Sequence, residues 1–181
     1  AEVPTLVFIG RHRYYKGLDT LIRAMPTLNA RLLIGGDGPM RGEWEALART
    51  LGVTGRVQFL GEISDADLPR FFASGDIFVL PANSRAEAFG KVLLEAMATG
   101  LPCVTTELGT GTSYAVQDGL TGFVVPPQDP AALGDALRRL LEDAGVRKTM
   151  GAAGRARVLA EFTPEKLLER TQKIYREVLD S

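Results

Sequence analysis

The stretch LPANSRAEAFGKVLLEAMATG, residues 80–100, contains the end of a predicted strand, a loop and a predicted helix. It begins at the end of an apolar run, residues 76–80, that predicts a buried strand. A polar loop follows, and the pattern then predicts a helix from about residue 89 to Thr99, with Gly100 placed to end it in a left-handed conformation. Apolar residues lie on nearly every side of this helix, so we expect it to be buried.

Two glutamates stand out in this stretch. Glu95 lies in the middle of the predicted helix, and Glu87 lies eight residues earlier, in the loop that leads to it. A carboxylate removed from water is costly without a partner, so we expect Glu95 to have one. The free N–H groups at the helix start, at about residues 88–91, face the same way as Glu87 and predict a site for a ligand with hydroxyls and negative charge. The alternative is that Glu87 is an ordinary solvated residue of the loop.

Composition excludes several classes of protein. The chain has 181 residues, enough for one domain with a sizeable core, and a formal net charge of −1. The balanced charge argues against a nucleic-acid-binding protein, which needs a concentrated basic face. No apolar run reaches the roughly 20 residues of a membrane-spanning helix. The single cysteine, Cys103, excludes an internal disulfide and a cysteine metal cluster, and we expect it to pack as a small apolar residue in a strand.

Apolar runs that predict buried strands alternate along the chain with segments that predict helices. The predicted strands are residues 5–10, 31–35, 57–61, 76–80, 101–105 and 121–125. The predicted helices are residues 18–25, 41–51, 64–74, 89–99, 130–142 and 146–161, with a last helix from Thr163. This alternation predicts an α/β fold, a Rossmann-like doubly wound parallel sheet with helices on both faces. Such sheets bind ligands beyond the carboxyl ends of their strands, where the strand order reverses.

The loop after the first predicted strand carries several cations. Arg11 and Lys16 suit a diphosphate at the binding edge of the sheet, because Arg11 offers a planar fork of donors and Lys16 a point charge. The alternative is a solvated basic loop. His12, the single histidine, lies between two arginines, and we interpret it as a surface or packing residue rather than as a base.

Three further motifs are weaker. Gly36-Asp37-Gly38 resembles the start of a dinucleotide fingerprint but lacks its third glycine, so we interpret it as a tight turn that lets a ligand approach the backbone. Asp65 and Asp67 suggest a metal-binding pair, but their place at a predicted helix start favours capping. The hydroxyls of residues 110–113 either line a sugar or phosphate pocket or belong to a flexible surface loop.

Several motifs occur in order along the chain: Gly10-Arg11 with Lys16-Gly17, Gly36-Asp37-Gly38-Pro39, Phe59-Leu60-Gly61, residues 87–100, and Asp118-Gly119 with Thr121-Gly122. With these motifs the chain resembles the C-terminal, donor-binding half of retaining GT-B glycosyltransferases of the group 1, or family 4, type. The resemblance covers residues 5–143, and the two glutamates on either side of Phe89-Gly90 are its most specific feature.

The resemblance implies roles in holding the donor sugar and its phosphates. Glu87 would accept hydrogen bonds from the sugar hydroxyls, and Glu95 would bind the ribose. The sugar and the distal phosphate would be held by the backbone amides of Ala88, Phe89, Gly90 and Lys91. Lys91 is a departure from the family pattern, in which this position is more often apolar, and a cation in the first turn opposes the helix dipole.

Other implied roles concern the base and the leaving group. The base would contact Ile63, Leu68 and Gly36. Arg11 and Lys16 would neutralise the departing diphosphate, so the resemblance implies neither a cofactor nor a metal ion.

The resemblance also implies a larger enzyme. The donor would be a UDP- or GDP-sugar, and the acceptor, a saccharide or a lipid-linked precursor, would be bound by an N-terminal domain that this chain lacks. We therefore expect residues 1–162 to form the nucleotide-sugar domain and residues 163–181 a helix that packs toward the missing domain or on a second copy. The isolated fragment is expected to be inactive. The expected location is the cytoplasm, or the inner face of the membrane through the missing half.

Two other functions stay open from the sequence. A non-catalytic module that senses nucleotide sugars would show the same donor motifs, and a nucleotide-sugar epimerase shares the fold. A phosphorylase of this fold would need a lysine for pyridoxal phosphate, which no motif supplies.

Overall fold

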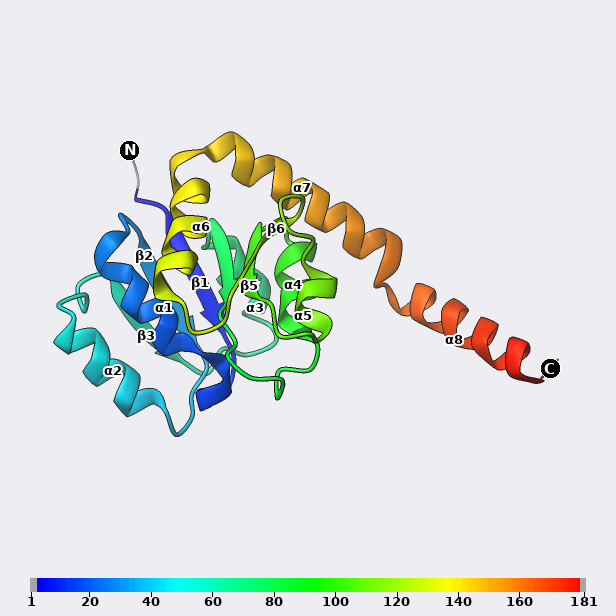
Figure 1. Ribbon diagram of the computed structural model, residues 1–181, viewed down its shortest axis with the longest axis horizontal. Coiled ribbons are helices and arrows are strands. Elements are labelled where there is room, and N and C mark those ends of the chain that lie inside the picture. The colour runs from blue at the N-terminus through cyan, green and yellow to red at the C-terminus, as the bar shows by residue number, and fades with distance from the viewer. Residues whose placement is uncertain (1–2, 180–181) are drawn as a thin grey trace.

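The structure of the chain, a computed structural model, describes residues 3–179 (Figure 1). Within these residues, six strands form one parallel sheet in the order β3-β2-β1-β4-β5-β6. The strands are β1 (Thr5–Ile9), β2 (Arg31–Gly35), β3 (Val57–Gly61), β4 (Ile77–Leu80), β5 (Cys103–Thr106) and β6 (Gly122–Val125). Every residue of β4 and β5 is buried, which explains why their sequences are apolar runs rather than alternating patterns.

Helices cover both faces of the sheet. They are α1 (Leu18–Ala24), α2 (Arg41–Thr50), α3 (Leu68–Ala73), α4 (Lys91–Ala98), α5 (Gly111–Ala115), α6 (Pro130–Glu142), α7 (Ala144–Glu161) and α8 (Pro164–Leu179), with 3₁₀ turns η1 (Tyr14–Lys16) and η2 (Met25–Thr27). On one face α1 packs against α2 and α6, and on the other α4 packs against α5 and α7. The doubly wound α/β fold predicted from the sequence is confirmed.

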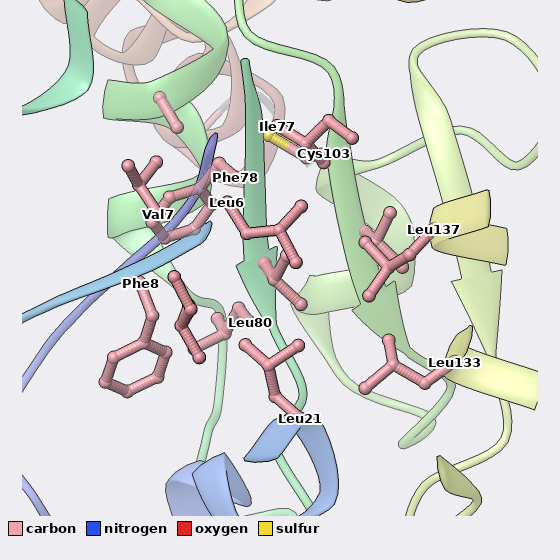
Figure 2. Close-up of a cluster of buried hydrophobic side chains, with 14 of the residues drawn as sticks. Leu6, Val7, Phe8, Leu21, Ile77, Phe78, Leu80, Cys103, Leu133 and Leu137 are labelled. Carbon is pink, nitrogen blue, oxygen red and sulfur yellow. The ribbon is translucent and has the colours of Figure 1, made fainter. Parts of the chain in front are cut away.

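The core lies between the sheet and these helices. Figure 2 shows part of this core, with Phe8, Phe78 and Cys103 from the strands, Leu21 from α1 and Leu137 from α6. All of these side chains are buried. Cys103 packs as an apolar residue, as expected, and burial raises the pKa of its thiol above the ordinary value.

Two predicted elements differ from the structure. Helix α3 begins at Leu68 rather than at Ser64, because Ser64–Asp67 forms a turn in which the Asp67 N–H donates to the Ser64 carbonyl oxygen at 2.9 Å. Residues 111–115, expected as part of a loop, form the short helix α5. The remaining helices and strands begin and end within about two residues of their predicted bounds.

The last helix, α8, leads away from the sheet (Figure 1). No described residue of α8 is buried. Its apolar side chains are 58–82 % exposed, and they are Leu167, Leu168, Ile174, Tyr175, Val178 and Leu179. The last helix therefore exposes the apolar face that its sequence predicts. None of the helices in residues 3–179 combines the length and the apolar character that crossing a bilayer requires.

Candidate functional site

The two central strands define where a site is expected. β1 lies beside β4, and from this pair the sheet continues to β2 on one side and to β5 on the other. The loops that follow β1 and β4 therefore diverge at the carboxyl ends of the strands. This reversal of strand order is where doubly wound sheets bind ligands.

Two adjoining pockets open at this position. The main pocket, of about 570 Å³, is lined by Ile9, Gly10, Lys16, Ile63, Leu68, Ala86, Glu87, Ala88, Phe89, Gly90, Lys91, Val92 and Glu95. The second pocket, of about 650 Å³, is lined by Ile9, Gly10, Arg11, Gly36, Asp37, Gly38, Glu62 and Ile63. Of the site residues predicted from the sequence, Arg11 and Gly36 line the second pocket and the others line the main one. The structure thus brings the predicted residues together at one edge of the sheet.

An ion pair joins the two loops inside the main pocket. Lys16 Nζ donates to Glu87 Oε2 at 2.5 Å, and the two side chains are only 13 % and 11 % exposed. The alternative that Glu87 is a solvated loop residue is therefore wrong. A buried charge needs a partner, and each of these two side chains supplies it for the other.

Two hydrogen bonds from Asn83 hold the same two loops together. The Asn83 N–H donates to the Tyr15 carbonyl oxygen at 2.9 Å, and Asn83 Nδ2 donates to that of Tyr14 at 3.0 Å. Gly17 has a φ of 65°, and a Cβ at this position would come 2.0 Å from the Pro81 carbonyl oxygen. Only glycine meets both conditions, so the residue after Lys16 fixes where the ion pair forms.

The loop after β4 ends at Gly90, which adopts a φ of 72° before the first residue of α4. The N–H groups of residues 88–91 donate to no acceptor within the part of the chain that the structure describes. These residues line the main pocket. Unpaired N–H groups at the positive end of a helix favour binding of an anion.

Glu95 differs from the expectation of a buried carboxylate. Its side chain is exposed and lines the main pocket. The buried side of α4 consists of Leu93, Ala96 and Met97, whereas the side that carries Lys91 and Glu95 borders the pocket. Water therefore solvates this carboxylate, and the prediction that Glu95 is buried and needs a partner for that reason is wrong.

His12 is buried more deeply than the sequence indicated. Its ring lies among Phe8, Trp44 and Phe59, with centroid distances of 6.5, 5.2 and 6.1 Å. Neither ring nitrogen has a hydrogen-bond partner among residues 3–179. Burial lowers the pKa of the His12 imidazole. His12 is thus a packing residue, and its neighbours in the sequence, both arginines, gave no signal of this burial.

Gly36-Asp37-Gly38 forms the tight turn predicted from the sequence. The Gly38 N–H donates to Asp37 Oδ1 at 2.6 Å, and Arg41 Nη1 donates to Asp37 Oδ2 at 3.0 Å. These bonds lower the pKa of the Asp37 carboxyl. A Cβ on Gly36, whose φ is 97°, would come 2.1 Å from the Gly10 carbonyl oxygen, so the turn closes against the end of β1.

The hydroxyls of residues 110–113 do not line either pocket. Instead, Thr110 Oγ1 donates to the Glu87 carbonyl oxygen at 3.0 Å, and the Gly111 N–H donates to that of Ala88 at 2.8 Å. Thr112 Oγ1 donates to the Thr106 carbonyl oxygen at 3.1 Å. The segment is therefore neither a wall of these two pockets nor a loop, since residues 111–115 form α5, and its hydrogen bonds support the loop that carries Glu87.

The predicted capping by Asp65 and Asp67 is wrong, because Asp67 is the N-cap residue of α3 but its side chain accepts no N–H of the helix. Ser64 Oγ donates to Asp67 Oδ2 at 2.7 Å in the turn before α3, while Asp65 is exposed. Within residues 3–179, no three histidine, cysteine, aspartate or glutamate side chains lie close enough to hold a metal ion.

The site combines features that suit one class of ligand. A lysine and a glutamate lie beside unpaired amides, and the apolar side chains of Ile63 and Leu68 line the same pocket. Cations and amides bind an anionic group, carboxylates bind hydroxyls, and apolar walls bind a flat ring.

A family model for the group 1 glycosyl transferases matches residues 1–157. The chain belongs to this family. The match includes the whole sheet and both loops of the main pocket.

Curated proteins of known name agree with this assignment. The chain is 41 % identical over 157 residues to the D-rhamnosyltransferase WbpZ of Pseudomonas aeruginosa, covering 87 % of this chain and 41 % of the relative. It is 35 % identical over 185 residues to a GDP-mannose-dependent alpha-(1-6)-phosphatidylinositol monomannoside mannosyltransferase of Mycobacterium tuberculosis, covering 97 % and 48 %. The chain spans less than half the length of these curated relatives.

Among solved structures, the sucrose-phosphate synthase of Thermosynechococcus elongatus is similar to this group 1 glycosyl transferase chain. The TM-score is 0.86 at 32 % identity, with 99 % of this chain and 46 % of that chain covered. The sheet and helices described above are therefore the architecture of a GT-B glycosyltransferase domain.

Lys91, the departure from the family pattern, begins α4 at the wall of the main pocket. Its side chain is exposed and forms no ion pair among the described residues. The opposition between its charge and the helix dipole is therefore weakened by solvent.

Proposed function

We propose that this chain is the donor-binding half of a retaining hexosyltransferase that uses a nucleoside diphosphate sugar. The observation that carries the proposal is the position of the Lys16–Glu87 ion pair beside the unpaired amides of residues 88–91. The pair offers a cation for phosphate and a carboxylate for sugar hydroxyls within one pocket. The GDP-mannose dependence named for the M. tuberculosis relative supports a nucleotide sugar as ligand.

Each part of the ligand has a place in this proposal. Glu87 accepts hydrogen bonds from the sugar hydroxyls, and the amides of residues 88–91 hold the sugar and distal phosphate. Glu95, exposed at the pocket wall, binds the ribose. The base lies against Ile63, Leu68 and Gly36, at the boundary between the main and second pockets.

The reaction follows from where the cations lie. When the bond between the sugar and the diphosphate breaks, negative charge develops on the departing phosphate. Arg11 and Lys16 stabilise that charge, so the reaction needs no metal ion in this proposal. The acceptor attacks from the same face that the leaving group departs, which retains the configuration at the anomeric carbon.

In this proposal the acceptor is bound outside this chain. We propose that a second domain binds a saccharide or lipid-linked acceptor. The exposed apolar face of α8 packs toward that domain or on a second copy. Without the second domain, this chain alone transfers no sugar. A cytoplasmic enzyme of polysaccharide or glycolipid assembly fits the D-rhamnosyltransferase and mannosyltransferase relatives.

Thermal denaturation with UDP-, GDP- and ADP-sugars tests the binding proposal. A ligand that binds only the folded state at 100 times its Kd adds about 2.7 kcal/mol to the free energy of unfolding, so a matching donor should raise the Tm by several degrees. Arg11→Met should reduce this shift, while Arg13→Met, in the same loop but outside both pockets, should not. Absence of a shift with every nucleotide sugar would contradict the proposal.

A transfer assay on the longer enzyme separates catalysis from sensing. If Glu87→Gln abolishes transfer of sugar from a donor that still binds, the site is catalytic. If the parent enzyme binds the donor but transfers nothing, the non-catalytic module is correct, and interconversion of the donor sugar would identify an epimerase.

A further inference from the structure

Arg157, near the end of α7, is buried in an unusual way for an arginine that lies outside both pockets. Its side chain is 9 % exposed. The guanidinium uses all three of its nitrogens: Nη1 pairs with Glu161 at 2.6 Å, Nη2 donates to the Tyr114 carbonyl oxygen at 2.8 Å, and Nε donates to that of Ala115 at 3.3 Å. A planar fork of donors is needed for this geometry, and a lysine has none.

The carbonyl groups that Arg157 binds belong to the end of α5. The other end of α5 holds the pocket loop, since the Gly111 N–H donates to the Ala88 carbonyl oxygen and Thr110 Oγ1 to that of Glu87. Contact is close here, because a Cβ on Gly111 would come 2.2 Å from the Phe89 ring. Arg157 is therefore connected through α5 to the segment that carries Glu87.

A second connection runs through aromatic rings. The Arg157 guanidinium lies 5.3 Å from the ring centres of both Tyr114 and Phe162. The Phe162 ring in turn lies 6.1 Å from that of Phe89, which lines the main pocket. Phe162 is the residue at which α7 ends before α8 begins. Both connections therefore start at the C-terminal end of α7.

We infer that Arg157 is a positioning residue for the sugar side of the donor site, acting through α5 and Phe162 on the loop of Glu87, Ala88 and Phe89. This inference rests on the proposed function, because that function places the donor sugar against this loop. Arg157 contacts neither the pocket nor the ligand. Its effect is to keep the loop where the carboxylate and amides converge.

The two ends of the site depend on Arg157 to different extents. The segment 87–89 is held from outside by α5 and Phe162. The start of α4 and Glu95 are held by the packing of α4 itself, through Leu93, Ala96 and Met97. The amides of Gly90 and Lys91, at the start of α4, remain in place for the distal phosphate. Loss of Arg157 should therefore weaken binding of the sugar more than binding of the nucleoside diphosphate.

The experiment compares Arg157→Met with Arg155→Met, an exposed arginine on the same helix. Calorimetric titration of each variant with a nucleoside diphosphate and with the corresponding nucleotide sugar gives the two affinities. For Arg157→Met we expect about tenfold weaker binding of the nucleotide sugar and less than about threefold weaker binding of the diphosphate, since small displacements of a positioning group have effects of this size or larger. Arg157→Lys should fall between the wild type and Arg157→Met.

Exchange of the Gly111 amide with deuterium gives a readout that needs no ligand. This N–H donates to the Ala88 carbonyl oxygen, so its protection should fall in Arg157→Met and persist in Arg155→Met. Should Arg157→Met fail to fold, Phe162→Leu removes the ring contact with Phe89 and is expected to show the same selective loss.

Unchanged affinities with unchanged Gly111 protection would overturn the inference, and so would equal losses for diphosphate and nucleotide sugar. Equal effects of Arg155→Met would overturn it as well. If the wild type binds neither compound, the donor-site proposal itself fails and the inference fails with it. If the wild type binds and Arg157→Met binds equally well, only the inference about Arg157 fails.

Discussion

Replacing Lys16 with methionine removes one partner of the ion pair at the centre of the site. The Glu87 side chain, which is only 11 % exposed, then has no cationic partner. Breaking a fully buried pair costs about 3–5 kcal/mol. Because the pair lies at the wall of an open pocket that admits water, we expect a smaller loss for Lys16→Met, about 2 kcal/mol.

Urea denaturation followed by circular dichroism measures this loss. With a slope of about 2 kcal/mol per molar urea, the midpoint should fall by about 1 M. Lys91→Met is the matched control, because Lys91 lines the same pocket but is exposed and makes no ion pair among the described residues. Its midpoint should stay close to that of the wild type, with a change in stability below about 0.5 kcal/mol.

A double-mutant cycle with Glu87→Gln isolates the interaction. If the 2.5 Å contact stabilises the folded chain, the double variant should be less destabilised than the sum of the single variants by about 1 kcal/mol or more. Equal midpoints for Lys16→Met and Lys91→Met, or strictly additive losses, would refute the reasoning.

Three further predictions follow from single residues. Burial lowers the pKa of His12 below its unfolded value of about 6.5, so the stability that its neutral form contributes is complete above that pH and is lost as the pH falls toward the folded-state pKa. Urea midpoints between pH 7 and pH 5 should therefore fall less steeply in His12→Leu than in the wild type. Gly17→Ala should cost more than about 2 kcal/mol, because its Cβ meets Pro81, whereas Gly52→Ala, at a similar φ in open space, should cost about 1 kcal/mol in the same assay. The buried Cys103 thiol, with its raised pKa, should react with a thiol reagent at the rate of unfolding and become fast only in denaturant.

Much of the fold was predictable because apolar runs report burial directly. The strands around Leu6 and Phe78 are buried on both faces, so their sequences hold no competing pattern. The short helix α5 was missed because its sequence, rich in glycine and hydroxyls, has low helix propensity. Contacts with the 87–89 loop stabilise it, and such contacts are not visible in local sequence.

The candidate site was predictable as a set of residues, but their environments were not. Glu95 was expected to be buried, but it borders the open pocket and is exposed. For Glu87 the sequence left a site residue and a solvated loop residue open, and only the structure shows that it pairs with Lys16. Arg157 lies 70 residues beyond Glu87 and acts through an intermediate helix. Neither spacing nor composition identifies such a residue.

The central claim is that an anionic nucleotide binds between the cations of the first loop and the amides where α4 begins. Titration of the ¹⁵N-labelled chain with a nucleoside diphosphate, followed by amide chemical shifts, tests it most directly. We predict that the largest shifts occur at residues 88–91, and that Lys16→Met weakens the titration while Lys91→Met has a smaller effect. Shifts centred instead on the separate pocket between α1 and α2, near Tyr14 and Trp44, would contradict the account.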